Sequence, residues 1–337
     1  MKKYLLLTIA AVAIVACSSD YEVEKTENSA PVPIILGTAI DGTATRSNSQ
    51  SIQTGDPSAT PAVPGYLTNG KKAGVYIYYT TKQESQTMGT GTYGYKNLEY
   101  TVNGSAGAMN YPTGNQPYFP EVKTQNIDIY VFSPRIYTGT GELKDQTAVT
   151  FNTVANQTDA DDYIASDFVW GSKTGVTNAD AANPINVSLS HKLSKINVNI
   201  GGGSGVALSS LLGASITLAG VNLAGTVNLT TGAVATTGTT TSTLTFTTAT
   251  AAPTGKFASS TTTDCYTASA VIIPQTLTSQ DLTITLSNGS KYKYSLSKTF
   301  AAGTAYNFDI TVNASGLSLT TTISNWTAGG NTTGTAE

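Results

Sequence analysis

The residues that could carry out chemistry are few in this chain. The only histidine, His191, lies in the segment LSHKLSKI, and an acid–base site built on it would need a second base. No neighbour of Cys265 in the sequence suggests the lowered pKa that a thiol nucleophile requires. We therefore interpret Cys265 as a buried, small apolar residue. We interpret His191 as a residue that hydrogen-bonds to the backbone or lies at a strand edge.

Two short segments could bind ligands, but neither has the spacing that binding needs. The run DADD at 159–162 offers carboxylates, which suit calcium, yet the regular ligand spacing of a calcium loop is missing. We interpret it as a solvated acidic loop. The run GGGSG at 201–205 is not followed by Gly-Lys-Ser/Thr, so it predicts a turn or hinge and not a phosphate loop. The sequence thus predicts a protein that is not an enzyme and has no metal or cofactor.

The N-terminus has the pattern of an export signal. Two lysines precede a short apolar run, Leu5 to Val15, which is shorter than the about 20 residues that span a bilayer as a helix. The run ends in Ile-Val-Ala-Cys, which resembles a bacterial lipobox with Cys17 as the lipidated first residue of the mature chain. We predict a lipoprotein signal peptide at 1–17. The alternative is an ordinary signal peptide that happens to contain a cysteine.

A polar, acidic segment follows, and it cannot form a core. We interpret 18–46 as an acidic tether that ends in a first strand. Residue 18 is serine and not aspartate, which by resemblance to Gram-negative lipoproteins favours the outer membrane, with the acidic residues favouring its outer surface. The predicted location is an outer-membrane lipoprotein precursor and then the cell surface.

Composition narrows the class of protein further. The net charge is −3 and only 12% of residues are charged, which argues against a nucleic-acid partner, because such a protein needs a basic patch. Once Cys17 is lipidated, Cys265 has no cysteine to pair with in the chain. Stability must then come from buried apolar surface, and about 300 residues suffice for two cores.

Alternation with period two recurs along the chain, with turn residues between the runs. It predicts an all-β protein with seven or eight strands in each half, enough for one antiparallel sandwich apiece. We place an N-terminal β-sandwich at 47–200 and a C-terminal β-sandwich at 201–337. Only VALSSLLGAS, at 206–215, could form a turn or two of helix.

Several motifs occur in one order along the chain: YFPEVKTQNIDIYVFSPR, SDFVWGSK, VSLSHKLSKINVNI, VIIPQTL and ITVNASGLSLTTTISNW. With the lipobox and a basic residue in TATRS, this order resembles the fimbrillin family. The resemblance covers most of the chain from about residue 30. Members of that family are lipoprotein pilins of type V pili, and the resemblance implies two tandem transthyretin-like antiparallel β-sandwich domains.

The resemblance also implies how such a protein assembles. An arginine-specific protease cuts in the N-terminal region, the first strand leaves, and a terminal strand of the next subunit fills the groove. Arg46 lies in a polar stretch after the predicted first strand, so the implied cut falls between Arg46 and Ser47. The chain has one other arginine, Arg135, which we expect to be a poorer protease site. The alternative is that Arg46 is a solvated residue of no consequence.

Two segments have matching alternate residues, which suggests the pair of strands that would be exchanged. In both, the residues on one face are aliphatic, aliphatic, threonine and aliphatic. The hypothesis is that a donor strand at 316–326 of one subunit fills the groove left by the removable strand of another. Coincidence is the alternative in a threonine-rich chain. The removable set is Ile34, Leu36, Thr38 and Ile40; the donor set is Leu317, Leu319, Thr321 and Ile323.

The leading functional prediction is therefore a structural subunit of a type V fimbria that supports adhesion. Its predicted partners are other fimbrial subunits, the outer membrane through the lipid, an arginine-specific protease, and a host protein or glycan. The alternative is a monomeric or tip-located lipoprotein adhesin that binds glycan or host protein. Exposed tyrosines in 75–81 and 93–100 would indicate such an adhesin, whereas we expect these rings to pack on strand faces. A hydrolase on a β-sandwich is a third and weaker reading.

Overall fold

The computed structural model describes most of the chain between residues 31 and 332, and residues 32–337 belong to one compact unit. The described ranges are 31–40, 52–53, 66–67, 69–79, 94–103, 107–120, 125–136, 141–182, 184–239, 241–246, 255–257, 259–260, 263–325 and 331–332. The fold over these ranges is mostly β, as the alternation predicted.

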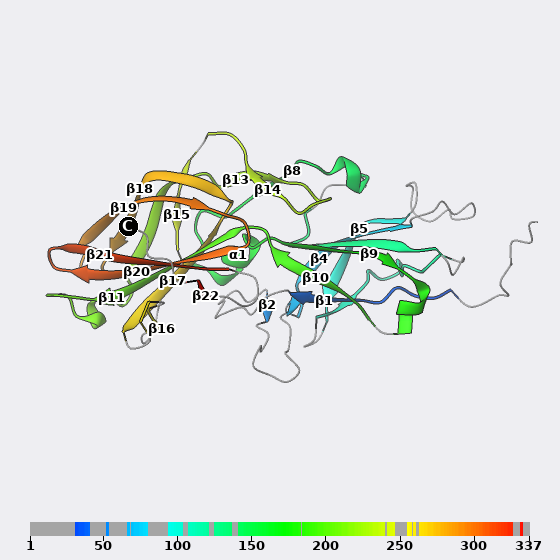
Figure 1. The fold of residues 1–337 in the computed structure, drawn as a ribbon, viewed down its shortest axis with the longest axis horizontal. Coiled ribbons are helices and arrows are strands. Elements are labelled where there is room, and N and C mark those ends of the chain that lie inside the picture. The colour runs from blue at the N-terminus through cyan, green and yellow to red at the C-terminus, as the bar shows by residue number, and fades with distance from the viewer. Residues whose placement is uncertain are drawn as a thin grey trace, which may run out of the picture. The chain divides into compact units, whose positions relative to one another are not determined.

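Seven strands from the first two hundred residues form a closed sheet (Figure 1). The alternate residues of its strands point to an apolar interior that includes Val75, Ile77, Ile129 and Val131, all fully buried. The pair β1–β10 is parallel and every other pair is antiparallel. In sheet order the strands are β1 (Leu36–Ile40), β10 (Ile185–His191), β9 (Val169–Val176), β7 (Ile127–Ser133), β4 (Lys72–Tyr79), β5 (Gly94–Val102) and β6 (Ala108–Asn110).

Two further sheets enclose a second core, in which Val198 of one sheet and Ile284 of the other belong to the same apolar cluster. The first sheet has the order β16 (Gly255–Lys256), β17 (Asp264–Ile272), β11 (Ser194–Gly202), β20 (Thr304–Asn313), β21 (Gly316–Asn325) and β22 (Asn331–Thr332). The second has the order β15 (Ser242–Thr245), β12 (Ser215–Val221), β18 (Gln275–Thr285) and β19 (Lys291–Phe300).

A small sheet joins the two halves of the chain. It consists of β14 (Val234–Thr236), β13 (Ala224–Val227) and β8 (Val149–Asn152), and β8 comes from the first half. A third apolar cluster also draws on both halves, with Phe132 of β7 packed near Val271 of β17. The boundary predicted at residue 200 lies inside β11, so the division into two transthyretin-like sandwiches stays a prediction.

The remaining described elements are short: β2 (Ile52–Gln53) and β3 (Tyr66–Leu67), the helix α1 (Ala160–Ala165), and the 3-10 turns η1 (Leu143–Asp145), η2 (Asn178–Ala182) and η3 (Leu208–Leu211). The turn η3 confirms the helical turn expected at 206–215. In the run GGGSG, Gly201 and Gly202 belong to β11, and only residues 204–205 form a turn. Among the described residues, no helix is long and apolar enough to cross a membrane.

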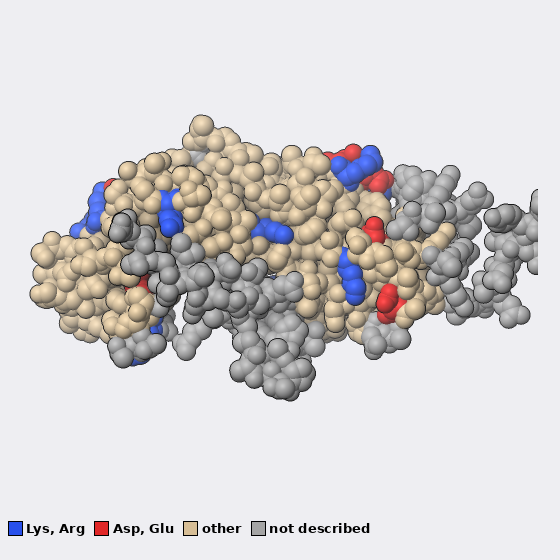
Figure 2. Space-filling view, viewed as in Figure 1, with Lys and Arg blue, Asp and Glu red and all other residues tan. Residues whose placement is uncertain are grey.

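Charged residues are sparse on the face drawn in Figure 2. Lysine, arginine and carboxylate side chains lie singly or in small mixed groups among uncharged residues, wherever the surface is coloured. Six described Lys or Arg side chains, those of Lys72, Lys96, Arg135, Lys144, Lys256 and Lys293, are paired with carboxylates at hydrogen-bonding distance. The coloured part of this face therefore shows no basic stripe of the kind that tracks a nucleic-acid backbone.

Candidate functional site

The first described strand, β1, is built into the closed sheet on both of its edges. Residues Leu36–Ile40 pair in parallel with Ile185–Leu189 of β10, and Leu36 and Gly37 pair antiparallel with Met109 and Ala108 of β6. Backbone bonds continue upstream, since the Ile34 N–H donates to the Pro117 carbonyl (2.9 Å). Figure 1 shows β1 beside β10, although the two strands are far apart in the sequence.

The side chains of residues 34–38, in β1 and just before it, alternate as the sequence predicted. Ile34 and Leu36 are fully buried in the interior of the closed sheet, and Thr38 is 3% exposed. Ile35, which points the other way, is 46% exposed. Residue 40 pairs with Leu189 through its backbone, and its side chain lies outside the described part. The predicted removable residues are thus paired and buried at 34, 36 and 38.

The predicted donor strand occupies a different environment. β21 pairs along its whole length with β20, from Gly316 opposite Asn313 to Asn325 opposite Thr304. On its other edge the described residues give it only two partners, both in β22, at positions 323 and 324. Leu317 and Leu319 are half-buried against the second core. Residues 321 and 323 pair with Phe308 and Tyr306, and their side chains are outside the described part.

Three of the predicted site residues, Cys17, Arg46 and Ser47, lie outside the described residues. The other arginine, Arg135, is held by two partners: its guanidinium donates to the Glu99 carboxylate (3.1 Å) and to the Asn97 carbonyl (2.9 Å). Its side chain is 22% exposed. A protease would have to break these contacts to bind Arg135 in an extended conformation.

A cleft of about 390 Å³ lies beside Arg135, lined by Leu67, Lys71, Lys72, Glu99, Ser133, Pro134, Arg135, Asp161, Ile164, Ala165, Asp167 and Val169. Glu99 accepts from both Lys72 (2.7 Å) and Arg135. The hydrogen bond from Lys72 lowers the pKa of Glu99, and the nearby charges of Lys72 and Arg135 lower it further. A general base needs the opposite shift, towards neutral pH, so Glu99 is poorly suited to acid–base chemistry.

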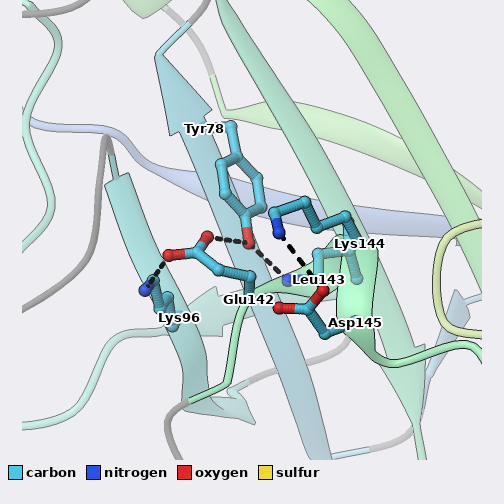
Figure 3. Close-up of polar contacts among 6 residues, drawn as sticks. All are labelled: Tyr78, Lys96, Glu142, Leu143, Lys144 and Asp145. Atoms are coloured by element: carbon cyan, nitrogen blue, oxygen red, sulfur yellow. Dashed lines mark hydrogen bonds and ion pairs between the residues drawn. The ribbon is translucent and has the colours of Figure 1, made fainter.

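A half-buried polar network, which the sequence did not suggest, ties β4 and β5 to η1 (Figure 3). Glu142 forms an ion pair with Lys96 and accepts from the Tyr78 hydroxyl (3.4 Å). The same hydroxyl accepts from the Leu143 N–H (2.7 Å). Burial is the largest cause of the raised pKa of Tyr78, and the charge of Glu142 adds to it. The network therefore keeps Tyr78 neutral and fixes the segment after residue 141.

His191, at the end of β10, is buried and its Nδ1 lies 2.8 Å from a carboxylate oxygen of Asp167. The sequence interpretation placed it at a strand edge or on a backbone partner, whereas it is the last residue of β10, paired with Val169 of β9, and its ring contacts a side chain. Lys195 of β11 is also buried, and burial lowers the pKa of Lys195 to about 8, with the charge of Asp167 opposing that shift. No local sequence signal links these residues, because they meet only where the two halves of the chain join.

Cys265 is fully buried, as expected, and burial raises the pKa of its thiol to about 11. The acidic run at 159–162 is largely exposed, as expected, but it begins a helix and not a loop: Asp159 caps α1 by accepting from the Asp161 N–H (2.7 Å). An aspartate at this position satisfies a helix N–H that would otherwise lack a partner, which explains why the segment begins a helix. Within the described ranges, no group of three or more His, Cys, Asp or Glu side chains could hold a metal ion.

The described tyrosines at 75–81 and 93–100 pack on strand faces. Tyr76 and Tyr100 are fully buried and Tyr79 is 6% exposed. Tyr78 and Tyr95 are half-buried. None of these five rings is exposed, so the described residues of the two segments do not form the aromatic platform that the adhesin alternative would use.

Comparison with known proteins agrees with the fold and with the predicted family. Residues 60–326 match the family described as Fimbrillin-like. Over 358 aligned residues, covering all of both chains, the protein is 27% identical to the "Putative fimbrium subunit Fim1C" of Bacteroides uniformis.

Two solved structures share this fold. One is a "putative cell adhesion protein" of Bacteroides ovatus, with a TM-score of 0.64, 17% identity and coverage of 90% of this chain and 100% of that one. The other, described in the same words, is from Bacteroides uniformis, with a TM-score of 0.59, 19% identity and coverage of 86% and 98%. Since the family match spans most of the 337 residues, the chain belongs to the fimbrillin-like family.

Proposed function

We propose that this protein is a structural subunit of a bacterial surface fimbria, made as a lipoprotein on Cys17 and assembled by strand exchange after a cut between Arg46 and Ser47. One observation carries the proposal: β1 is fully enclosed in the closed sheet, yet it is the first described strand of the chain. A single cut after β1 can therefore release a core strand without dividing any other described element.

Removal of β1 would leave a groove between β10 and β6. Its floor is the apolar interior that now contacts Ile34 and Leu36. A second subunit can fill the groove with its β21, which carries the same alternation of side chains. Strand addition of this kind gains affinity from backbone bonds and specificity from alternate side-chain pockets.

The free energies involved are adequate for assembly. Burying three aliphatic side chains contributes about 5–9 kcal/mol, at about 1.5–3 kcal/mol each. Each backbone hydrogen bond contributes about 0.5–1.5 kcal/mol. Ordering of the donor strand opposes this gain. Leu317 and Leu319 are already half-buried on their own sheet, so the net gain is smaller than the sum of these terms.

The cut is tested by Arg46→Ala in cells that make the protein. We expect lipidated, exported monomers that do not polymerise, seen by electron microscopy and by N-terminal sequencing, whereas the wild-type chain should start at Ser47. Arg135→Lys is the matched control and should polymerise normally. Normal fimbriae from Arg46→Ala would refute the role of Arg46 and favour the monomeric or tip-located adhesin.

The donor strand is tested by replacing Leu319 and Ile323 together with aspartate. The monomer should stay folded, because the backbone pairing of β21 with β20 does not depend on these two side chains. Polymer growth should stop, because the new carboxylates would enter an apolar groove. Ser318→Asp with Thr320→Asp, on the exposed face of β21, is the control. Normal polymers from the first variant would show that β21 is not the donor.

A further inference from the structure

Thr38 is a buried polar residue in an otherwise apolar row of β1. Its Oγ1 donates to the Gly107 carbonyl (3.3 Å) and accepts from the Leu67 N–H (3.4 Å). The backbone N–H of Thr38 also donates to the Gly107 carbonyl (2.9 Å). Leu67 is 1% exposed, so water has little access to this pair of backbone groups. The apolar site of β1 thus contains one position that is matched to a hydroxyl.

A strand that replaces β1 must satisfy the same two backbone groups. An aliphatic side chain at the position of Thr38 would leave the Leu67 N–H without an acceptor, and a buried N–H without a partner is costly. A hydroxyl at any other inward position would itself be buried among apolar side chains. This single position therefore discriminates among the ways in which a strand can enter the groove.

We infer that the Leu67 N–H and the Gly107 carbonyl set the direction and register of an incoming strand from a second copy of this chain. In that strand the hydroxyl of Thr321 takes the place of the Thr38 hydroxyl and forms the same two hydrogen bonds. This inference rests on the proposed strand exchange. The incoming strand runs as β1 does, parallel to β10 and antiparallel to β6. Leu317, Leu319 and Ile323 then replace Ile34, Leu36 and Ile40.

The alternative poses each create a mismatch. A shift of two residues places Leu319 or Ile323 at the hydroxyl position. A reversed strand in the same register places Leu319 there and Thr321 at the fully buried site of Leu36. A reversed strand that keeps Thr321 at the hydroxyl position brings Asn325 to the fully buried site of Ile34. A shift of one residue turns Ser318, Thr320 and Thr322 inward and loses every aliphatic contact.

The first arm of the test compares three donor variants of the full chain after cleavage by an arginine-specific protease. Thr321→Val keeps the shape and removes the hydroxyl, and we expect the association constant between subunits to fall about tenfold or more. Thr321→Ser should restore most of it. Thr322→Val, the same change on the opposite face, should leave it unchanged. Thermal unfolding of each uncut chain separates effects on assembly from effects on the monomer.

The second arm reads the register directly by disulfide cross-linking between subunits. Residue 109 of β6 is the antiparallel neighbour of residue 36. In the inferred pose Met109→Cys should therefore cross-link with Leu319→Cys, because opposed antiparallel residues have Cα atoms about 4.5–5.5 Å apart, within reach of a disulfide. Cross-linking of Met109→Cys with a cysteine at 317, 321 or 323 would show another register or direction and overturn the inference.

The outcomes separate the inference from the proposal beneath it. If wild-type and all three donor variants polymerise equally, strand exchange stands and the role of the hydroxyl is refuted. If the cut wild-type chain does not polymerise at all, strand exchange is refuted and the inference falls with it. A loss of assembly in Thr321→Val alone, together with the 109–319 cross-link, supports both.

Discussion

β1 and β21 present the same alternation of aliphatic, aliphatic, threonine and aliphatic residues, but the fold treats them differently. β1 has a partner strand on each edge, and its residue Leu36 and the preceding Ile34 are fully buried. β21 has one full-length partner among the described residues, and its residues Leu317 and Leu319 are only half-buried. The same pattern of residues therefore occurs in a buried strand of the closed sheet and in a strand next to the edge of a sheet of the second core.

The difference teaches which strand can move at low cost. Detaching β21 breaks its ladder with β20 and its two pairs with β22, and exposes leucine side chains that were already partly in water. Detaching β1 breaks two ladders and opens the interior of the closed sheet. We therefore expect β1 to leave only after its covalent link is cut, and β21 to detach more readily than β1 in an intact chain. Strand exchange would then move β21 from a site that half-buries its leucines to one that buries them fully.

The largest expected effect on stability comes from replacing one leucine of each strand with aspartate. Leu36→Asp should prevent folding of the uncut chain, because an ionised carboxylate in the apolar interior costs several kcal/mol, comparable with the stability of a domain. Leu319→Asp should fold, with a melting temperature lowered by a few degrees. Circular dichroism and thermal unfolding of the two variants make the test, with Ser318→Asp as the exposed control. Equal stability of the two would remove the distinction between the strands.

The sequence alone predicts only part of this difference between β1 and β21. Period-two alternation correctly assigned inward faces to Ile34, Leu36 and Thr38, because alternation depends only on the geometry of an extended strand. It could not identify β10 or β6 as neighbours, since strand pairing depends on contacts between residues far apart in the chain. For the same reason the backbone partners of Thr38, at Leu67 and Gly107, were missed.

The helix α1 shows a local failure of the same approach. The sequence indicates a loop at the acidic run 159–162, but this run begins a helix that carries Tyr163 and Ile164, and the next strand starts at Val169. The signal that was available is Asp159, whose carboxylate caps the helix. A short run of mixed polar and apolar residues fits both periods, so the cap decides.

The next effect concerns the junction where the closed sheet meets the second core. Burial lowers the pKa of Lys195 from 10.5 to about 8. Between these two values the unfolded chain binds a proton that the folded chain does not, so stability should rise as the pH rises. From pH 8 to 9.5 the rise is about 2 kcal/mol, at about 1.4 kcal/mol per pH unit.

Urea unfolding at several pH values measures this contribution, and Lys195→Met should flatten the rise. The exposed Lys291→Met is the control and should keep it. The range must end below pH 10, because burial raises the pKa of Tyr163, which makes stability fall once unfolded tyrosines ionise. If the free energy of unfolding still rises with pH in Lys195→Met, other groups cause the pH dependence and Lys195 does not contribute to it.

The smallest expected effect compares one ion pair from each region. Lys96 and Glu142, beside the closed sheet, are 11% and 20% exposed, whereas Lys293 and Asp281 of the second core lie 2.8 Å apart and are 63% and 47% exposed. Lys293→Met should change the free energy of unfolding by less than about 0.5 kcal/mol, because water screens an exposed pair. Lys96→Met should cost about 1–3 kcal/mol, because it removes the ion-pair partner of the half-buried Glu142 carboxylate in the network of Figure 3. Double-mutant cycles measure the coupling free energy of each pair. Adding Glu142→Gln to Lys96→Met should recover part of the lost stability. The cycle of Lys293→Met with Asp281→Asn should give a coupling free energy close to zero. Equal coupling free energies in the two cycles would mean that the closed sheet and the second core protect their ion pairs from water to the same extent. That result would contradict the contrast between the buried β1 and the half-buried β21.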